Sequence, residues 1–396
     1  MHIQTADVTR DAVAAAVRRF EQATGAKVDN QADKNEQFKQ NIAIALPSGS
    51  PPDVFHTWGG GGLADHVKTG LVAPVPDDFS TAGIRPTVLA LCQVGGKLYA
   101  VPTGVSVVAF WYRKSLFSEH AIAVPTSLAE LTQACMKLRR AGVSPIALGN
   151  VAHWPGAFYF DYLVLRQGGA AEYISKSNAG GGPADTPAAR TAGELIRALV
   201  QANAFIDGFG GLNYGQSRAA FFKGDAAITL MGSWLLSYAI SDRPEVVDDL
   251  GLFAFPALDK GPDAASVLGG TNAAYAVSAK SKHKDLAFKL VQFLSDEAAA
   301  QGWAEAKRIP AREVDLPNAA PVLAQSLQLL EAAPRLQLYY DQALEPAVAE
   351  KHKPQTQLLF ARETASVGWR VAVGAGVLVV LVVLGFVLRA AFRSGE

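Results

Sequence analysis

The chain has 396 residues, which is too long for one ordinary hydrophobic core, so two lobes are the default expectation. Its 36 basic and 36 acidic side chains cancel, which argues against a nucleic-acid surface and favours a neutral ligand over an ionic one. The two cysteines, Cys92 and Cys135, exclude a disulfide framework and show no zinc-ligand spacing. A single bridge between them stays open, but Cys135 lies on an apolar helical stripe, which favours a buried thiol.

Residues 1–70 predict strands alternating with helices. A short strand at residues 3–6 precedes a helix that Thr9 can cap and Gly25 ends, and residues 26–31 are typical of a second strand. A second helix carries Phe38 and leads into a third strand. This order predicts a doubly wound parallel sheet.

The stretch from residue 51 to residue 63, PPDVFHTWGGGGL, has the layout of a binding loop. A short buried strand, Asp53–His56, runs into Trp58 and then into four glycines, Gly59–Gly62, that let the backbone come close to another group. In an open α/β sheet such loops lie beyond the carboxyl ends of strands, where ligands bind. We therefore expect one wall of a site here.

Later segments continue the same alternation. GGKLYAVP predicts a hairpin turn, Ser127 and Glu130 predict a capping box, and AAITLMGSW predicts a strand that enters a loop. Ser281–Trp303 predicts one amphipathic helix with these residues facing inward: Leu286, Leu290, Phe293 and Leu294.

Motifs of nucleotide binding and of catalysis are absent from the sequence. The glycines do not form GxGxxG, GGK is followed by leucine rather than by serine or threonine, and there is no GxSxG or HExxH. Paired carboxylates for glycoside hydrolysis stay open, because their separation is a spatial property. We predict no catalytic residue, no metal site and no cofactor.

Four tryptophans, Trp58, Trp154, Trp234 and Trp303, lie at predicted element boundaries rather than inside apolar stripes. Aromatic rings offer a flat apolar face to the C–H groups of a sugar, while neighbouring polar groups bind its hydroxyls. For any one tryptophan a core or hinge position is about as plausible as ligand contact. Together they favour a pocket for a neutral polar ligand.

The C-terminal end differs from the rest. Val371–Leu388 is a run of 18 residues without a charge, flanked by Arg370 and Arg389, which predicts a membrane-spanning helix within residues 368–390. No export signal precedes the predicted first strand. The span predicts attachment to the cell membrane, but the lysine and arginine counts on its two sides do not settle its orientation. Either the sequence starts after a removed signal, or its start is misplaced, or the chain is not exported.

Several motifs in order resemble one protein family: TRDAVAAAVRRFEQATGAKV, PPDVFHTWGGGGLADHVKTGLVAPV, GGKLYAVP, FFKGDAAITLMGSW, and GGTNAAYAVSAKSKHKDLAFKLVQFLSDEAAAQGW. They resemble the extracellular solute-binding proteins of carbohydrate ABC importers, the group that contains maltose- and oligosaccharide-binding proteins. The resemblance implies a two-lobe, periplasmic-binding-protein-like α/β fold with a hinge. The first lobe would comprise residues 1–109 and 263–310, and the second residues 110–262 and 311–362.

The resemblance also implies a binding domain on the extracytoplasmic side of the cell membrane, with a ligand site between its lobes. Its glycine loop falls on these residues of the first lobe: His56, Trp58, Gly59 and Gly60. Its stacking tryptophans fall on Trp154 and Trp234 of the second lobe, and Asn272 and Arg308 are implied donors to sugar hydroxyls. The expected partners are a carbohydrate and the subunits of an ABC permease, which would recognise the closed form.

Two alternatives remain. A membrane-anchored sugar sensor could use the same lobes and span, although only residues 389–396 follow the span. A carbohydrate-active enzyme is less expected, because no acid/base constellation is visible in the sequence. The resemblance implies a binding protein and not an enzyme.

Overall fold

The computed structural model describes residues 1–258, 265–316 and 320–361 of the chain. Residues 1–361 form one compact unit. The predicted membrane span lies outside the described residues. Within the described ranges, no helix is both long enough and apolar enough to cross a bilayer.

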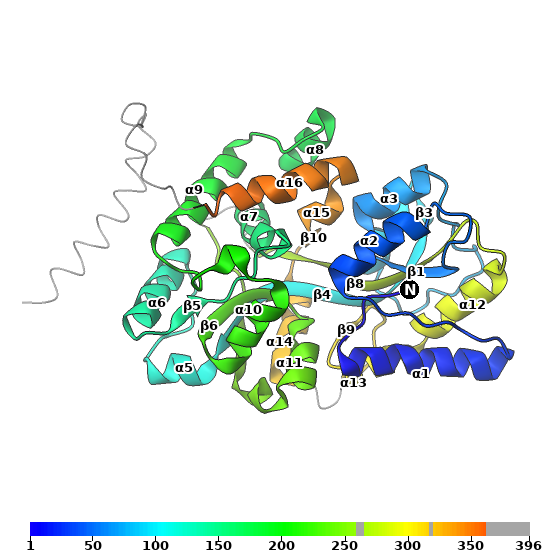
Figure 1. The fold of residues 1–396 in the computed structure, drawn as a ribbon, viewed down its shortest axis with the longest axis horizontal. Helices are drawn as coiled ribbons and strands as arrows, with labels where there is room; N and C mark the ends of the chain where they lie inside the picture. Colours follow the sequence, from blue (N-terminus) through cyan, green and yellow to red (C-terminus); the bar gives the residue numbers. More distant parts are fainter. Residues whose placement is uncertain (259–264, 317–319, 362–396) are drawn as a thin grey trace, which may run out of the picture. The chain divides into compact units, whose positions relative to one another are not determined.

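The long strand β4, Ala100–Arg113, organises the main sheet, whose order is β1-β8-β4-β6-β5. Its first half pairs with β8 (Val267–Val277) and β9 (Ile309–Pro310), and its second half pairs with β6 (Ala226–Gly232) and β7 (Leu250–Phe253). Figure 1 shows β4 running through the middle, with one group of helices around each end. One strand therefore belongs to both halves of the fold.

The sheet is mixed, so the prediction of a doubly wound parallel sheet is wrong. β1 (Val54–Thr57) and β4 both run antiparallel to β8, and β4 runs antiparallel to β6. Parallel pairs join β5 (Ser144–Ile146) to β6 and β10 (Leu336–Leu338) to β8. The reason is long-range: β8, from the last third of the chain, lies between β1 and β4, and local alternation of strands and helices does not reveal such an insertion.

The two strands predicted before residue 32 are also wrong. Only an isolated bridge between His2 and Ala32 joins these segments. α1 (Asp7–Thr24) begins before Thr9, whose hydroxyl donates to the Ala6 carbonyl at 2.9 Å. Gly25, with φ 73°, ends the helix as predicted, because glycine adopts the left-handed conformation without a steric cost.

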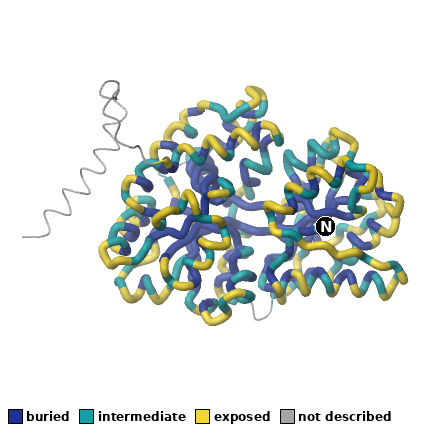
Figure 2. The backbone as a smooth tube through the Cα atoms, in the orientation of Figure 1, coloured by how far each residue is buried: buried dark blue, intermediate teal, exposed yellow. Residues whose placement is uncertain are grey.

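Around the end of β4 that pairs with β8 lie α1, α2 (Asn35–Ala45), α3 (Gly60–Lys68), α12 (Lys284–Ser295) and α13 (Glu297–Glu305). Figure 2 shows buried positions on the inner sides of these helices and exposed positions on their outer sides. α1 packs mainly against α12 and α13. α12 and α13 take the place of the single helix that the sequence predicts.

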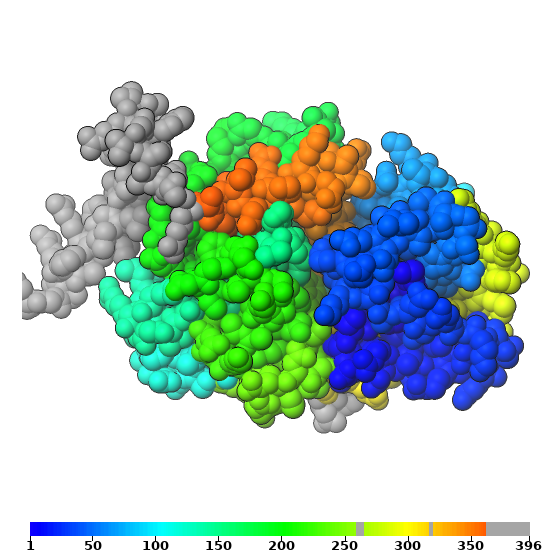
Figure 3. Space-filling model, viewed as in Figure 1, coloured from blue at the N-terminus to red at the C-terminus, as the bar shows by residue number. Residues whose placement is uncertain are grey.

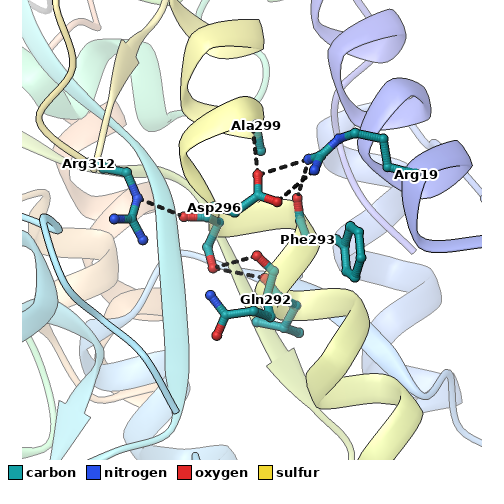
Figure 4. A network of polar contacts seen from close by, with 8 residues as sticks. Arg19, Gln292, Phe293, Asp296, Ala299 and Arg312 are labelled. Atoms are coloured by element: carbon teal, nitrogen blue, oxygen red, sulfur yellow. Dashed lines mark hydrogen bonds and ion pairs between the residues drawn. The ribbon is translucent and has the colours of Figure 1, made fainter. Parts of the chain in front are cut away.

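Asp296 separates α12 from α13. Its carboxylate accepts the Ala299 N–H at 2.8 Å and caps α13, while Arg19 of α1 donates to both carboxylate oxygens at 2.6 and 2.8 Å. Figure 4 shows this network, in which Arg312 Nε also donates to the Ser295 carbonyl at 3.1 Å. Leu286 is 41% exposed rather than inward, whereas Leu290 and Leu294 are buried as predicted.

Seven helices surround the other end of β4: α5 (Lys114–Glu119), α6 (Leu128–Arg140), α7 (Trp154–Arg166), α8 (Ala170–Gly180), α9 (Pro187–Gln201), α10 (Tyr214–Lys223) and α11 (Leu235–Asp242). The Ser127 hydroxyl accepts the Glu130 N–H at 3.2 Å, which confirms the predicted start of α6. Three helices follow later in the chain: α14 (Pro321–Ala332), α15 (Tyr340–Ala343) and α16 (Pro346–Leu358). Shorter elements include α4 (Pro86–Leu89), β2 (Gln93–Val94) and β3 (Lys97–Leu98), with β2 and β3 forming the predicted hairpin.

Both cysteines are free and buried. Cys135 lies on the inner face of α6, as its apolar stripe predicts. Burial raises the pKa of the Cys92 and Cys135 thiols to about 12, so both remain protonated and unreactive.

Candidate functional site

Six aromatic side chains from distant parts of the sequence form one cluster, which we call the aromatic cluster: Trp154, Phe158, Tyr214, Trp234, Tyr238 and Tyr339. The ring centroids of Trp154 and Trp234 are 6.3 Å apart, those of Trp154 and Tyr214 are 5.3 Å apart, and those of Trp234 and Tyr339 are 6.2 Å apart. The cluster therefore unites the two tryptophans that the sequence assigns to the second lobe.

Element boundaries position these rings. Trp234 lies two residues after Gly232, the last residue of β6, and Trp154 begins α7, while Tyr339 follows β10. An added Cβ at Gly232 would lie 2.0 Å from the Trp234 ring, so only glycine allows the ring to fold back over the end of its own strand.

The residue before Trp154 is strained. His153 has φ 64°, a left-handed conformation that costs a non-glycine residue about 1 kcal/mol or more. Its N–H donates to the Asn150 carbonyl at 3.1 Å, and the Asn150 side chain accepts the Gly156 N–H at 2.9 Å. This turn fixes the direction in which Trp154 leaves the start of α7.

A polar atom next to these rings lacks a partner. The Ser233 hydroxyl is buried and makes no hydrogen bond to any residue that the structure describes. The Tyr214 hydroxyl is buried beside the Arg218 guanidinium and the Trp234 indole. Leaving a group such as the Ser233 hydroxyl unpaired costs roughly 1–3 kcal/mol, so an unpaired group beside aromatic rings marks a place where a ligand hydroxyl gains affinity.

Asn272 lies on β8 and is 6% exposed. Its amide nitrogen donates to the Val105 carbonyl at 3.2 Å, but its Oδ1 atom has no hydrogen-bond donor within the described ranges. An added Cβ at Gly104 would lie 2.2 Å from this oxygen, so glycine at that position leaves the oxygen its space. Asn272 is thus held in place by one end of its amide and unsatisfied at the other.

Arg308 lies between α13 and β9 and is 5% exposed. Its Nε atom donates to the Ser237 hydroxyl at 2.7 Å, and that hydroxyl donates to the Ala306 carbonyl at 2.9 Å. The three tyrosines of the aromatic cluster, Tyr214, Tyr238 and Tyr339, are the titratable groups that act on its charge, and burial lowers the pKa of the guanidinium to about 10. Arg308 therefore adjoins the aromatic cluster.

The backbone before Arg308 turns sharply. Lys307 has φ 55°, at a helix end where glycine is usual, and the Arg308 N–H donates to the Trp303 carbonyl at 2.9 Å. This turn brings Arg308 to α11. A second contact nearby, 3.3 Å between the Thr5 and Tyr238 hydroxyls, joins the N-terminal segment to the same helix, and Figure 3 shows the two segments meeting at the surface.

The glycine loop, Gly59–Gly62, is predicted to approach a ligand, but in the structure three of its glycines lie against backbone atoms of the protein itself. An added Cβ would lie 2.2 Å from the Leu91 carbonyl oxygen at Gly59, 2.4 Å from the Gln342 carbonyl oxygen at Gly60, and 2.1 Å from the Leu344 carbonyl oxygen at Gly61. The glycines do allow a close approach. What approaches in this structure is the backbone of the protein itself, from residues 89–92 and from α15 and the residue after it.

His56 and Trp58 belong to a separate core cluster with Phe38. His56 is 1% exposed, and its ring packs edge-to-face against Trp58 with centroids 4.6 Å apart. Neither ring nitrogen has a partner among the described residues, and burial lowers the pKa of His56 well below its ordinary value. His56 is therefore a neutral core residue that supports Trp58, whose ring is partly buried.

The structure thus brings together Trp154, Trp234 and Arg308, and it places His56, Trp58, Gly59 and Gly60 in a second group with its own packing. Trp303 is 3% exposed within α13 and is a core residue. Sequence reasoning missed these members of the site: Tyr214, Ser233, Tyr238 and Tyr339. Their signal is weak, since Tyr214 and Tyr339 are marked only by lying at element boundaries.

Comparison with known proteins places the chain in context. The model of the family described as bacterial extracellular solute-binding protein matches residues 5–301. The chain is 27% identical over 267 residues to an uncharacterized ABC transporter extracellular-binding protein of Pyrococcus horikoshii, covering 65% of this chain and 57% of that protein. It is 25% identical over 218 residues to the multiple sugar-binding protein of Streptococcus mutans, covering 53% and 50%.

Among solved structures, one from the thermophilic bacterium Caldanaerobius polysaccharolyticus, determined in work on xylan utilization, superposes with a TM-score of 0.84 at 26% identity. That alignment covers 91% of this chain and 94% of the other. The fold is therefore the two-lobe α/β fold that the sequence resemblance implies. The chain spans about half the length of the two curated relatives described above.

Proposed function

The chain belongs to the bacterial extracellular solute-binding proteins, and from this premise we propose that it binds a sugar or short oligosaccharide between its lobes and delivers it to an ABC-type permease. The observation that carries the proposal is the aromatic cluster with the unpaired Ser233 hydroxyl beside it. Stacking faces at Trp154 and Trp234 suit the apolar face of a sugar ring, and the Tyr214 and Ser233 hydroxyls suit its hydroxyls. The similarity to the multiple sugar-binding protein of Streptococcus mutans supports this class of ligand.

For the lobes we propose the boundaries that the sequence implies, residues 1–109 with 263–310 and residues 110–262 with 311–362. The pairing of β4 supports this division, because its partners change from β8 and β9 to β6 and β7 near Val108. Beside the aromatic cluster, Ser237 of the proposed second lobe forms hydrogen bonds with Ala306 and Arg308 of the proposed first lobe. A sugar that touches both lobes would favour the closed form through its differential affinity, which is hinge closure by population shift.

The proposed ligand contacts are Trp154, Trp234, Asn272 and Arg308, with Trp58 as a platform on the opposite wall. We assign His56, Gly59 and Gly60 the role of shaping that wall, since their atoms are occupied by the core and by α15. No catalytic residue is proposed, and product formed from a bound sugar would contradict this part of the proposal.

The membrane span at residues 368–390 stays in the proposal on sequence grounds alone. Fractionation of cells that express the chain with and without residues 362–396 tests it. We expect the longer chain in the membrane fraction and the shorter chain outside it. Equal distribution of the two would remove the anchor from the account.

Thermal unfolding with a panel of mono- and oligosaccharides tests the binding proposal. A ligand that binds only the folded state adds about 2.7 kcal/mol at a concentration 100 times its dissociation constant, so Tm should rise by several degrees with at least one sugar. Trp234→Ala should abolish the rise while the circular dichroism spectrum keeps its shape. A flat response of the wild type across the panel would contradict the proposal.

A further inference from the structure

Arg308 carries a charge that the protein itself does not neutralise. Its side chain is almost fully buried, and no ion pair joins it to a carboxylate in the part of the chain that the structure describes. A buried charge without a partner costs several kcal/mol. Such a group is retained at a functional site when a partner arrives from outside.

Most of its hydrogen-bonding capacity is also unused. A guanidinium has five N–H donors, and only Nε–H of Arg308 has an acceptor among the described residues, the Ser237 hydroxyl. The contact to Ser237 therefore fixes the direction of the side chain and leaves the Nη1 and Nη2 groups, the fork that binds carboxylates in two parallel bonds, without acceptors.

A second buried arginine shows what a purely structural role looks like in this fold. Arg166 of α7 is 1% exposed, donates from Nη2 to the Phe255 carbonyl at 2.9 Å, and donates from Nη1 to the Ser266 carbonyl. Its guanidinium also lies 5.0 Å from the centre of the Tyr162 ring. Arg166 is bound by its own protein, whereas the end of Arg308 is not.

The groups around Arg308 are those of a site that awaits an anion. Its neighbours are the tyrosines of the aromatic cluster, and none of them supplies a carboxylate. The other arginine at the cluster, Arg218, already pairs with Asp242 at 2.9 Å and lies over the Tyr238 ring. Asp341, which follows Tyr339 closely in sequence, acts electrostatically on Tyr339.

We propose that the ligand of this protein is an acidic sugar, whose carboxylate is received by the Nη1 and Nη2 atoms of Arg308 while its ring lies against the aromatic cluster. This inference rests on the proposed function and narrows its substrate class to saccharides that contain a uronic acid. The balanced net charge of the whole chain, from which we predict a neutral ligand, determines the long-range electrostatic field. The buried guanidinium of Arg308 determines the preference for an acidic or a neutral sugar at the site itself.

Titration calorimetry of the full chain with matched sugar pairs tests the proposal at fixed ionic strength. The pairs are galactose with galacturonate, glucose with glucuronate, and the neutral and acidic forms of one short oligosaccharide of each sugar. We expect at least one acidic member to bind roughly tenfold or more tightly than its neutral partner, because a charge-assisted forked hydrogen bond replaces a neutral one.

Variants of Arg308 test whether this residue causes the preference for the acidic sugar. Arg308→Met should remove the preference for the acidic member, and Arg308→Lys should keep part of it because Lys retains the charge without the fork. Arg10→Met, an exposed residue paired with Asp7 on α1, is the matched control and should bind as the wild type does. Circular dichroism and Tm of each variant show whether it is folded.

The outcomes separate the two proposals. Neutral members that bind as tightly as acidic ones in the wild type overturn the inference and leave the proposed function standing, whatever the variants do. An acidic preference that survives in a folded Arg308→Met variant also overturns it. No binding of any member of any pair overturns the proposed function, and the inference falls with it.

Discussion

The glycine loop and the aromatic cluster differ in what fills the space around them. At Gly59, Gly60 and Gly61 that space is occupied by carbonyl groups of the protein, at distances that leave no room for even a methyl group. At the aromatic cluster, the Ser233 hydroxyl is buried without a partner among the described residues. Glycine in a sequence shows that something comes close, and only the fold shows whether it is a ligand.

Two buried arginines, Arg166 and Arg308, also differ in how far the protein itself satisfies their hydrogen-bond donors. Arg166 donates to two carbonyl groups of its own chain, whereas Arg308 keeps the end of its guanidinium unbound by the described residues. Groups satisfied by the protein contribute to stability, and groups left unsatisfied contribute to binding at a cost in stability. Substitutions in the two classes should therefore have effects of opposite sign on stability.

The largest expected effect is at Arg166. Arg166→Met removes the buried hydrogen bonds that the guanidinium donates to the Ser266 and Phe255 carbonyls, so the free energy of unfolding should fall by about 3 kcal/mol. Urea unfolding followed by circular dichroism measures it. A fall of less than 1 kcal/mol, which is the ordinary effect of a single replaced side chain, would break the contrast with Arg308.

Two neighbouring glycines of α3 give a matched pair. Gly61→Ala places a Cβ against the Leu344 carbonyl, and Gly62→Ala meets nothing within 4 Å. Overpacking against backbone costs about 1–3 kcal/mol, so Gly61→Ala should lower the free energy of unfolding by that amount, whereas Gly62→Ala should leave it unchanged or raise it slightly. If both variants unfold at the wild-type urea concentration, the close contact with Leu344 is not part of the stable fold in solution.

The protonation of His56 makes the packing of the glycine loop sensitive to acid. Its pKa in the folded protein is lowered by burial, so the unfolded chain binds a proton first as the pH falls below about 6.5. Stability should be unaffected above pH 7 and should fall below pH 6.5, by at most about 1.4 kcal/mol per pH unit for this one histidine. His56→Phe should make the decline between pH 6.5 and pH 5 shallower, and an unchanged slope would show that His56 is not held neutral.

Arg308→Met should have the smallest effect on stability, and of the opposite sign. Removing a buried charge that has no carboxylate partner among the described residues should leave the free energy of unfolding unchanged or raise it by about 1 kcal/mol. The measurement is urea unfolding without sugar. A loss of 2 kcal/mol or more would mean that Arg308 holds the lobes together and is not reserved for a ligand.

Local patterns predicted most of the helices and the strands β1 and β6, because apolar periodicity and capping residues act over a few positions. They did not predict the mixed sheet, which depends on β8 entering between β1 and β4, nor the break at Asp296, which caps α13 and also pairs with Arg19 of a distant helix. In the candidate site, too, the sequence predicted local features and missed those that depend on distant residues. Trp154 and Trp234 are visible as boundary residues, whereas the lack of partners at the Ser233 hydroxyl and at the end of the Arg308 guanidinium, among the described residues, depends on the three-dimensional surroundings.

A crystal structure of the protein with the panel sugar that raises Tm most shows directly whether the aromatic cluster is the sugar site. We expect a sugar ring in van der Waals contact with Trp154 or Trp234 and a hydrogen bond from the ligand to the Tyr214 or Ser233 hydroxyl. A sugar bound elsewhere, with the aromatic cluster empty, would contradict the proposed site.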